Sequence, residues 1–394
     1  MANNFKTTKK PIDTKNGEFY SIEEDLCKLP DDFYLAFLAS SRSTGKTTSA
    51  LWYAYQRWVE DPSFKLYLIR RTGKEVTNLS CSWRRKVSTT GELIDGTTNS
   101  PFNSIRNLKQ GKKIPPIGAF KISEGISAFY VVEDGEPNVN KCLGYLLSLQ
   151  HIGTCKSMPA IECPNGNGLI LMDECLAVQG TWSSNDEFKQ FADLIVTIDR
   201  NFHNIPVVLM TNSTTMSSDL MRGFGITPIL SKMIVDGDTV HYEKGMYIHL
   251  IAPSEQRKAS YKNSGLYKLL DGTDYVGYAF ADEGFSSICD FSSIKPKSEC
   301  GLSSLDSGEH LLTFKIQQGQ TYEIKRYVNF TGKSQYLFYI EKVNDNSNTN
   351  LDLTKDNDSW TFKCLHQSQI RNQIRLNNCF CEDYNVYDYI MNKF

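Results

Sequence analysis

The sequence predicts an α/β protein with a mostly parallel sheet, followed by a smaller α+β domain. Three observations lead to this prediction. The chain has 394 residues, enough for two domains with separate cores. Between residues 33 and 210, short apolar runs alternate with segments of helical periodicity, a pattern typical of a parallel sheet with helices on both faces. After residue 236 the pattern changes to short strands separated by polar turns.

In the first part of the chain, the apolar runs predict buried strands. The runs lie at 33–38, 64–69, 142–149, 169–172 and 205–210, and a hairpin is expected at 118–122 and 127–132. Helices are expected at 46–59 and around 188–195, because their apolar residues fall on one face. Residues 74–115 are polar and predict a helix followed by a Lys- and Asn-rich loop.

The later part of the chain predicts a second domain. Strands are expected at 246–251, 311–316, 322–328 and 336–341. The stretch 276–307 is rich in Ser, Gly, Asp and Lys, which indicates a linker nearby. We therefore expect a first, α/β domain at 1–255, a linker at 256–295 and a C-terminal domain at 296–394.

Bulk composition is that of a globular protein in a reducing compartment. The net charge is −2, which neither supports nor excludes nucleic-acid binding. The 11 cysteines include no CxxC pair, and Cys379-Phe380-Cys381 is too tight for a zinc knuckle. No apolar run predicts a membrane helix. Residues 1–17 are polar and Lys-rich, so we expect a solvated arm and not a secretory signal.

The loop between the first expected strand and helix is the strongest motif. It reads Ser40-Ser41-Arg42-Ser43-Thr44-Gly45-Lys46-Thr47, a phosphate-binding loop with Ser in place of its first Gly. Its backbone N–H groups would surround the phosphates of ATP. Lys46 would neutralise the β- and γ-phosphates, and Thr47 would ligate Mg²⁺. A chance turn is the alternative, but the flanking strand and helix favour the motif; Ser40 has less freedom than Gly at positive φ.

A second motif follows the strand expected at 169–172, which ends in Asp173-Glu174. Asp173 would hold the Mg²⁺ shell, and Glu174 would orient and deprotonate the attacking water. Two solvated acids after a strand are common, so this motif alone is not specific. Together with the loop at 40–47, it predicts a P-loop ATPase of the catalytic-glutamate class.

Two further features have weaker support. Thr211-Asn212 ends the next strand, where a polar residue of this ATPase class senses the γ-phosphate; a helix cap is an equal alternative. Arg200 follows the helix before that strand and could reach the γ-phosphate of a neighbouring subunit. Pairing with Asp199 or capping of the helix end is favoured locally.

These residues carry a family resemblance over about residues 33–285. The chain resembles the DNA-packaging ATPases of tailed phages, the large-terminase-like motors. It is most similar to the short form found in small podophages with protein-primed genomes and a packaging RNA. The shared motifs are the loop at 40–47, Arg70-Arg71 at the end of a strand, Asp173-Glu174, Arg200-Asn201, Thr211-Asn212 and the segment 265–273.

The resemblance implies a set of partners and roles. The protein would form a homomeric ring, expected to be a pentamer, and would move double-stranded DNA through the portal of an empty procapsid, driven by ATP and Mg²⁺. Arg200 would act in trans, with Lys156 as a second trans-acting cation, and Arg70, Arg71 or Lys74 would face DNA. The protein would work in the host cytoplasm and at the portal vertex, without a membrane.

The C-terminal domain is expected to have an RNase-H-like fold without nuclease activity. Larger terminases place carboxylates on two Mg²⁺ ions there, the first from the middle of the first strand. The strand at 311–317 contains no acid, and Glu323 and Glu341 on the following strands do not form a convincing cluster. This domain would bind nucleic acid, including the packaging RNA, or the portal.

Three alternatives remain open at this point. One is a terminase large subunit with an active nuclease, and another is a helicase or a related remodelling ATPase, although no clear set of helicase motifs is present. The third is a non-enzymatic structural or nucleic-acid-binding protein with a decayed P-loop. Only Ser40 favours the third alternative, and Lys46, Thr47 and Asp173-Glu174 oppose it.

Overall fold

A computed structural model describes most of the chain between residues 19 and 392. The described residues are 19–27, 29, 33–41, 44–80, 86–87, 93–94, 99–106, 114–176, 186–200, 205–212, 218–270, 294, 296–300, 302, 308–316, 320–328, 336–343, 350–375 and 378–392. The chain forms two compact units. Unit 1 consists of Met1–Phe224 and Asp236–Ile288, and unit 2 of Gly225–Val235 and Cys289–Phe394. The boundaries expected from composition stay predictions.

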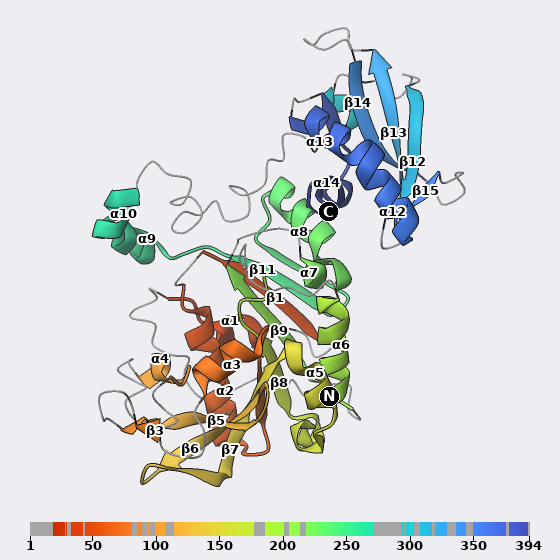
Figure 1. The fold of residues 1–394 in the computed structure, drawn as a ribbon. Coiled ribbons are helices and arrows are strands. Elements are labelled where there is room, and N and C mark those ends of the chain that lie inside the picture. Colours follow the sequence, from red (N-terminus) through yellow and green to blue (C-terminus); the bar gives the residue numbers. More distant parts are fainter. Residues whose placement is uncertain are drawn as a thin grey trace. The chain divides into compact units, whose positions relative to one another are not determined.

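Unit 1 is built on a nine-stranded sheet in the order β10-β11-β1-β9-β8-β2-β7-β6-β5 (Figure 1). Its parallel strands are β11 (Met246–Ile251), β1 (Leu35–Ser40), β9 (Val207–Asn212), β8 (Gly168–Met172), β2 (Lys65–Arg70) and β7 (Glu136–Ser148). Antiparallel strands lie at the edges: β10 (Val240–Glu243) at one, and β6 (Ile126–Glu133) and β5 (Ile117–Ser123) at the other. The predicted mostly parallel sheet is confirmed.

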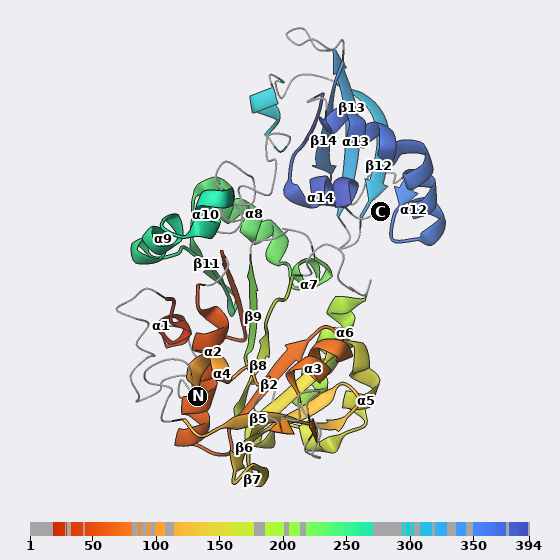
Figure 2. The ribbon, with the colours of Figure 1, turned by 60° about the vertical axis from the view of Figure 1, so that its left-hand side comes forward.

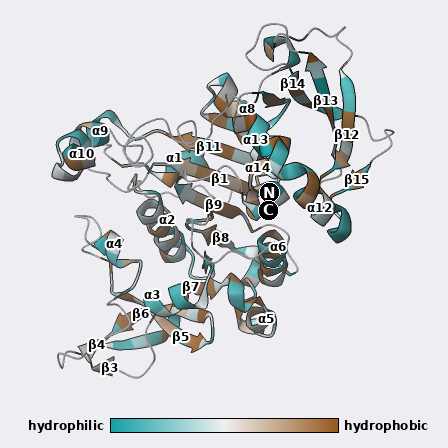
Figure 3. Ribbon diagram, turned by 45° about the horizontal axis from the view of Figure 1, so that its top comes forward, coloured by the Kyte–Doolittle hydropathy of each residue, from teal (hydrophilic) through white to brown (hydrophobic). Residues whose placement is uncertain are grey.

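Helices cover both faces of this sheet, with α2 (Lys46–Glu60) on one side and α6 (Glu187–Ile198) on the other (Figure 3). Neighbouring side chains of a strand point to opposite faces, so both sets are buried, and every residue of β1 is buried. The core on the α2 side contains Ala36 and Leu38 of β1 with Leu51 and Ala54 of α2. This two-sided burial explains the continuous apolar runs in the sequence.

Shorter elements complete unit 1. The helices are α1 (Ile22–Leu26), α3 (Gly73–Leu79), α4 (Asn103–Arg106), α5 (Ile152–Lys156), α7 (Asp219–Gly223), α9 (Glu255–Lys262) and α10 (Gly265–Leu270). Single helical turns are η2 (Leu149–His151), η3 (Pro159–Ile161) and η4 (Pro164–Gly166), and β3 (Lys86–Val87) pairs with β4 (Leu93–Ile94). Helix α3 packs against β2, β6 and β7 (Figure 2).

The predicted hairpin is confirmed as the antiparallel pair β5–β6. Several described strand segments were not predicted, among them the short strands β3 and β4, the first half of β7, and β10. Strand β7 begins at Glu136, well before the apolar run, because its polar first half lies at the exposed end of the β6–β7 pair. Strand β10 is a short, polar edge strand and so lacks the alternation that marks a half-buried strand.

Unit 2 contains a five-stranded sheet in the order β15-β12-β13-β14-β16. Strands β12 (Glu309–Lys315), β13 (Thr321–Val328) and β14 (Tyr336–Val343) are antiparallel neighbours, while β15 (Leu351–Asp352) and β16 (Cys379–Cys381) join β12 and β14 in parallel. The helical elements are α8 (Ile226–Asp236), η7 (Lys297–Cys300), α12 (Asp356–Phe362), the π-turn η8 (Lys363–Gln367), α13 (Ser368–Arg375) and α14 (Tyr384–Asn392). The core joins Phe314 and Ile340 of the sheet to Phe362 and Ile390 of the helices.

Candidate functional site

The candidate site lies at the carboxyl edge of the parallel strands in unit 1. Strands β1, β9, β8 and β2 are consecutive in the sheet. The predicted site residues at the ends of these strands therefore lie along one edge. They are the loop after β1, Asp173 after β8, Asn212 at the end of β9 and Arg70 at the end of β2. Ligands of open α/β sheets bind at this edge.

Lys46 is folded back into the loop that precedes α2. Its Nζ donates to the hydroxyl of Ser40, and it lies 3.4 Å from both Thr44 Oγ1 and Asn212 Oδ1. Burial lowers the pKa of Lys46 to about 8, an effect that the nearby Asp173 carboxylate opposes. Among the described residues, the hydrogen-bond partners of this buried ammonium are neutral oxygens, so an anion such as a phosphate would stabilise it.

The geometry of the loop explains its glycine and its serine. Gly45 precedes α2 with φ of 97°, a left-handed conformation that favours glycine. Ser40 is the last residue of β1 and does not have positive φ, so the loss of the first glycine causes no strain there. Its hydroxyl donates to Ser41 O at 2.7 Å and lies 2.6 Å from Thr44 Oγ1. Arg42 and Ser43 lie outside the described residues.

Thr47 and Asp173, the two predicted Mg²⁺ ligands, lie in contact with each other. The Thr47 hydroxyl donates to the Asp173 carboxylate, with both Oγ1–Oδ distances at 3.1 Å. Mg²⁺ in nucleotide sites takes one or two oxygen ligands from the protein and the rest from phosphates and water. These two oxygen-bearing side chains fit that requirement. The described residues contain no cluster of three or more His, Cys, Asp or Glu side chains that would hold a metal ion by itself.

Arg70 joins the two carboxylates of the second motif. Its guanidinium lies 3.1 Å from Asp173 Oδ2 and 3.5 Å from Glu174 Oε2. Glu174 has a left-handed backbone, with φ of 57°, and its side chain is 60% exposed. The Glu174 carboxylate can therefore be reached by water, although Arg70 holds it in this structure.

Arg71 has a different environment from Arg70. It is buried, and its guanidinium pairs with Glu187 Oε1 at 2.5 Å and donates to the carbonyl oxygens of Glu174 and Cys175. Burial raises the pKa of the Glu187 carboxyl, and the charge of Arg71 opposes that shift. Arg71 thus ties the segment after β8 to the start of α6. Arg70 and Arg71 were predicted to face DNA; in this structure both side chains contact groups of the protein instead.

The N-terminal segment is a part of the site that sequence reasoning missed. The backbone N–H of Tyr20 donates to Thr44 O at 2.9 Å, and Ile22 N–H donates to Ser49 Oγ at 2.6 Å. The Phe19 side chain closes over Gly45, where an added Cβ would lie 3.0 Å from Phe19 Cβ. The spacing of two apolar residues in α1 is too short a signal to have predicted this docking.

A buried carboxylate anchors this segment to β11. Asp25 accepts hydrogen bonds from the hydroxyls of Tyr20 and Tyr247, at 2.5 and 3.0 Å, and lies 2.6 Å from His249 Nδ1. Burial alone would raise the pKa of Asp25, but the contacts with His249 and the two tyrosines hold it below its ordinary value. Asp25 thus links β11, the strand next to β1, to the N-terminal segment that packs against Thr44 and Gly45.

The remaining predicted site residues lie outside this cluster. Lys156 ends α5 and pairs with Asp193 at 2.7 Å, and Arg200 follows α6 and pairs with Glu162 at 2.5 Å. Both cations are 48% exposed. Lys74 is exposed on α3.

At the end of β9, Asn212 points to Lys46, whereas the hydroxyl of Thr211 donates to the Asn212 carbonyl. Asn212 is therefore the member of the pair that reaches the site. Next to it, Ser41 Oγ is buried and has no hydrogen-bond partner among the described residues. A phosphate oxygen could satisfy that hydroxyl.

The fold and the edge cluster together describe an α/β protein with a large, mostly parallel sheet, in which several predicted site residues meet at one edge. Among solved structures, the chain is similar to the bacteriophage phi-29 viral genome packaging motor assembly, with a TM-score of 0.55 and 16% identity over 95% of this chain and 99% of that one. It is also similar to the phi-28 gp11 DNA packaging motor, with a TM-score of 0.56 and 14% identity over 96% of this chain and 99% of that one. The chain therefore has the fold of these two packaging-motor proteins over almost its whole length.

Other comparisons add no relative. No family model matches the sequence, and no curated protein matches it. Among the described residues, no helix is long and apolar enough to cross a membrane.

Proposed function

We propose that this protein is an ATP-driven motor that moves double-stranded viral DNA through a portal into an empty procapsid. The observation that carries the proposal is the cluster of Lys46, Thr47, Asp173 and Glu174 at one sheet edge. That cluster lies in a fold shared with two phage packaging motors. The cluster supports ATP hydrolysis, and the shared fold supports coupling of hydrolysis to packaging.

The site supports hydrolysis by the catalytic-glutamate scheme. Lys46 would bind the β- and γ-phosphates, and the backbone N–H groups before α2 would hold them from the other side. When bound, Mg²⁺ would neutralise phosphate charge between Thr47 and Asp173. Glu174 would orient the attacking water and accept its proton. Asn212 would sense whether the γ-phosphate is present, and its contact with Lys46 at the end of β9, between β1 and β8, supports that role.

Arg70 would regulate when Glu174 can act on water. Its guanidinium holds one oxygen of Glu174 and also contacts Asp173. Glu174 would therefore turn away from Arg70 to face an attacking water.

A ring of identical subunits, expected to contain five, would complete the site. Arg200 and Lys156 lie on the surface of unit 1 and reach acids other than those of the site. This placement supports a role at the site of the neighbouring subunit. The surface position of Lys74 likewise leaves it available for DNA phosphates, which give affinity without sequence specificity.

Unit 2 is proposed to be an RNase-H-like domain without nuclease activity, which would bind the portal or a packaging RNA. Glu323 of β13 and Glu341 of β14 are directly opposite each other, and Thr313 of β12 is opposite Glu323. Lys325 pairs with both glutamates, at 2.7 Å from Glu341 Oε1, and Lys297 lies 3.6 Å from Glu341 Oε2. Ammonium groups thus occupy the space between carboxylates that metal ions would need.

The test of the motor proposal is the ATPase rate of wild type and Glu174→Gln, with and without double-stranded DNA, at low salt with Mg²⁺. We expect DNA to stimulate hydrolysis and the variant to lose about 10²–10⁴-fold in rate, because it lacks the base. Glu136→Gln, at the exposed tip of the β6–β7 hairpin, is the matched control and should behave as wild type.

Three outcomes would point elsewhere. Hydrolysis that ignores DNA would favour a remodelling ATPase. No hydrolysis by wild type, even at concentrations where rings form, would favour a structural protein with a decayed loop. Metal-dependent DNA cleavage that requires unit 2 would favour an active terminase.

The protein would act in the host cytoplasm and at the portal vertex, which imaging of tagged protein during infection would test.

A further inference from the structure

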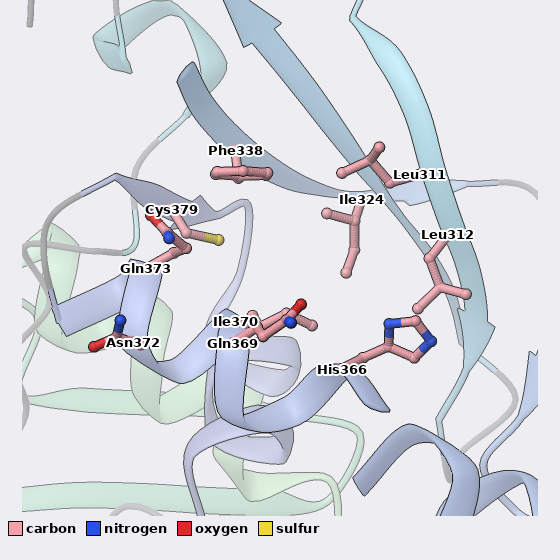
Figure 4. Close-up of a pocket in the computed structure, with 10 residues that line it drawn as sticks. All are labelled: Leu311, Leu312, Ile324, Phe338, His366, Gln369, Ile370, Asn372, Gln373 and Cys379. Atoms are coloured by element: carbon pink, nitrogen blue, oxygen red, sulfur yellow. The ribbon is translucent and has the colours of Figure 1, made fainter. Parts of the chain in front are cut away.

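Unit 2 contains a cavity of about 400 Å³ that the motor chemistry does not use. It lies between the sheet and the helical segment formed by η8 and α13 (Figure 4). Phe338 and Ile324 face it from the sheet side, and Ile370 and Gln369 face it from the helix side. The cavity is thus a slot whose two walls belong to the same folded unit.

The lining combines an apolar interior with neutral polar groups. Ile324, Phe338 and Ile370 supply the interior, and Gln369 and Gln373 supply amides that both donate and accept hydrogen bonds. The lining contains one imidazole, that of His366, and no Lys, Arg, Asp or Glu. A strongly charged ligand would lose its hydration in this slot without meeting a Lys, Arg, Asp or Glu of opposite charge. The lining therefore selects a neutral group.

The two amides have hydrogen-bonding capacity left for a ligand. Gln369 is exposed and makes no side-chain hydrogen bond within the described part of the chain. Gln373 Oε1 accepts from Asn378 Nδ2 at 3.3 Å, which leaves the Gln373 amide N–H groups available. Together the pair offers donors and an acceptor near an aromatic ring.

A nucleobase has the properties that this slot selects. It is flat and neutral, its faces are apolar, and its edge carries donors and acceptors. Amide side chains pair with base edges through two hydrogen bonds, and bases stack on aromatic rings in single-strand sites. Small-ligand sites occupy about 300–1,000 Å³, so a slot of this size admits a base and excludes a duplex.

The sheet face continues beyond the slot as a basic and aromatic surface. Arg326 is directly opposite Phe338 in the β13–β14 pair, so both side chains are on one face. The Arg326 guanidinium lies 4.8 Å from the centre of the Tyr336 ring and pairs with Glu309. If a base of a nucleic-acid strand entered the slot, the phosphates of that strand would lie near Arg326. Glu309 would weaken that contact, which leaves the base as the main source of affinity.

We propose that this slot binds one unpaired nucleobase of a single-stranded nucleic acid. The base lies between Phe338 and the α13 side, with its edge on Gln369 and Gln373. RNA and DNA present the same chemistry to the slot. The inference deepens the proposal that unit 2 binds RNA, and it does not depend on the motor activity, because a paired base in a translocated duplex cannot enter the slot.

The test measures, by fluorescence anisotropy, the binding of short, labelled single-stranded RNA and DNA to the full-length protein. Duplex DNA is the competitor. Phe338→Leu keeps the apolar volume and removes the stacking surface, and we expect it to weaken binding roughly fivefold to a hundredfold. Gln369→Ala should weaken binding several-fold. Asn357→Ala removes an exposed amide on α12 outside the slot and should bind as wild type.

The same variants separate this proposal from the motor proposal. Gln369 is exposed on a helix, so its truncation should leave circular dichroism and DNA-stimulated ATPase unchanged. RNA binding with no DNA binding would identify RNA as the source, and binding of both would support the shared base chemistry. Wild-type binding by both slot variants, or equal loss in the Asn357→Ala control, would overturn the proposal. Full competition by duplex DNA would overturn it as well.

Discussion

Each unit contains a pair of carboxylates bridged by a cation, yet the two pairs differ in access. In unit 1, Asp173 and Glu174 follow the end of β8, and Glu174 is 60% exposed beside Arg70. In unit 2, Glu323 and Glu341 lie within strands, are less than one fifth exposed and share Lys325. A carboxylate after a strand end can turn toward a substrate, whereas one within a sheet is fixed by its register. The two pairs thus carry the same charges, but only the first is open to a substrate in the proposed function.

The largest effect should come from Arg200, which is proposed to complete the ATPase site of the neighbouring subunit in a ring. Arg200→Ala should lower DNA-stimulated ATPase about 10³–10⁵-fold, because the arginine would stabilise charge at a neighbouring γ-phosphate. Rings mixed from Arg200→Ala and Glu174→Gln subunits should regain activity. In such rings, some sites combine an intact Glu174 with an intact Arg200 from the next subunit. Mixed rings as inactive as each parent would refute the trans assignment.

The next largest effect concerns the buried support of the first pair. Arg71→Met should destabilise the protein by about 3–5 kcal/mol, because Glu187 would remain buried without a partner. Denaturant unfolding would measure this loss. Adding Glu187→Leu should recover part of it by removing the stranded charge. Arg200→Ala, at a half-exposed site, is the control and should change stability by less than about 0.5 kcal/mol.

A smaller effect should appear in the pH dependence of nucleotide binding. Burial lowers the pKa of Lys46 to about 8, and phosphates bind its charged form. ATP affinity should therefore be constant below pH 8 and fall by up to about tenfold per pH unit above it. Equilibrium titration with a fluorescent ATP analogue would measure this fall. The variant Lys46→Arg stays charged, so any binding it retains should not change with pH; a wild-type affinity that is equally flat would contradict the prediction.

The smallest effect is expected at the second pair. Lys325→Met should destabilise the protein by about 1 kcal/mol, because Glu323 and Glu341 lose the cation between them while Lys297 still lies beside Glu341. It should produce no DNA cleavage with Mg²⁺ or Mn²⁺, since Thr313 supplies no carboxylate beside the two glutamates. Gel assays would detect cleavage, with Lys342→Met as an exposed control. Cleavage by Lys325→Met alone would show that Lys325 is what suppresses a nuclease site, and the comparison above would fail.

Much of the local structure around Asp173 and Glu174 could be predicted from the sequence. The strand at 35–40, the loop and α2 are contiguous, and so are β8 and Asp173-Glu174. The continuous apolar runs predicted strands buried on both faces, and the mostly parallel sheet is confirmed. The roles assigned to these residues in binding and hydrolysis stay predictions.

Tertiary structure decided which distant residues meet at these positions. Arg70 reaches Asp173 only because β2 and β8 are neighbours, and Asp25 meets His249 only because α1 packs beside β11. The slot beside Phe338 exists because α13 lies over one part of the sheet in unit 2. A sequence determines local structure through short-range periodicity and turn residues, which act between near neighbours. Contacts between distant segments depend on strand order and packing, which no local pattern records.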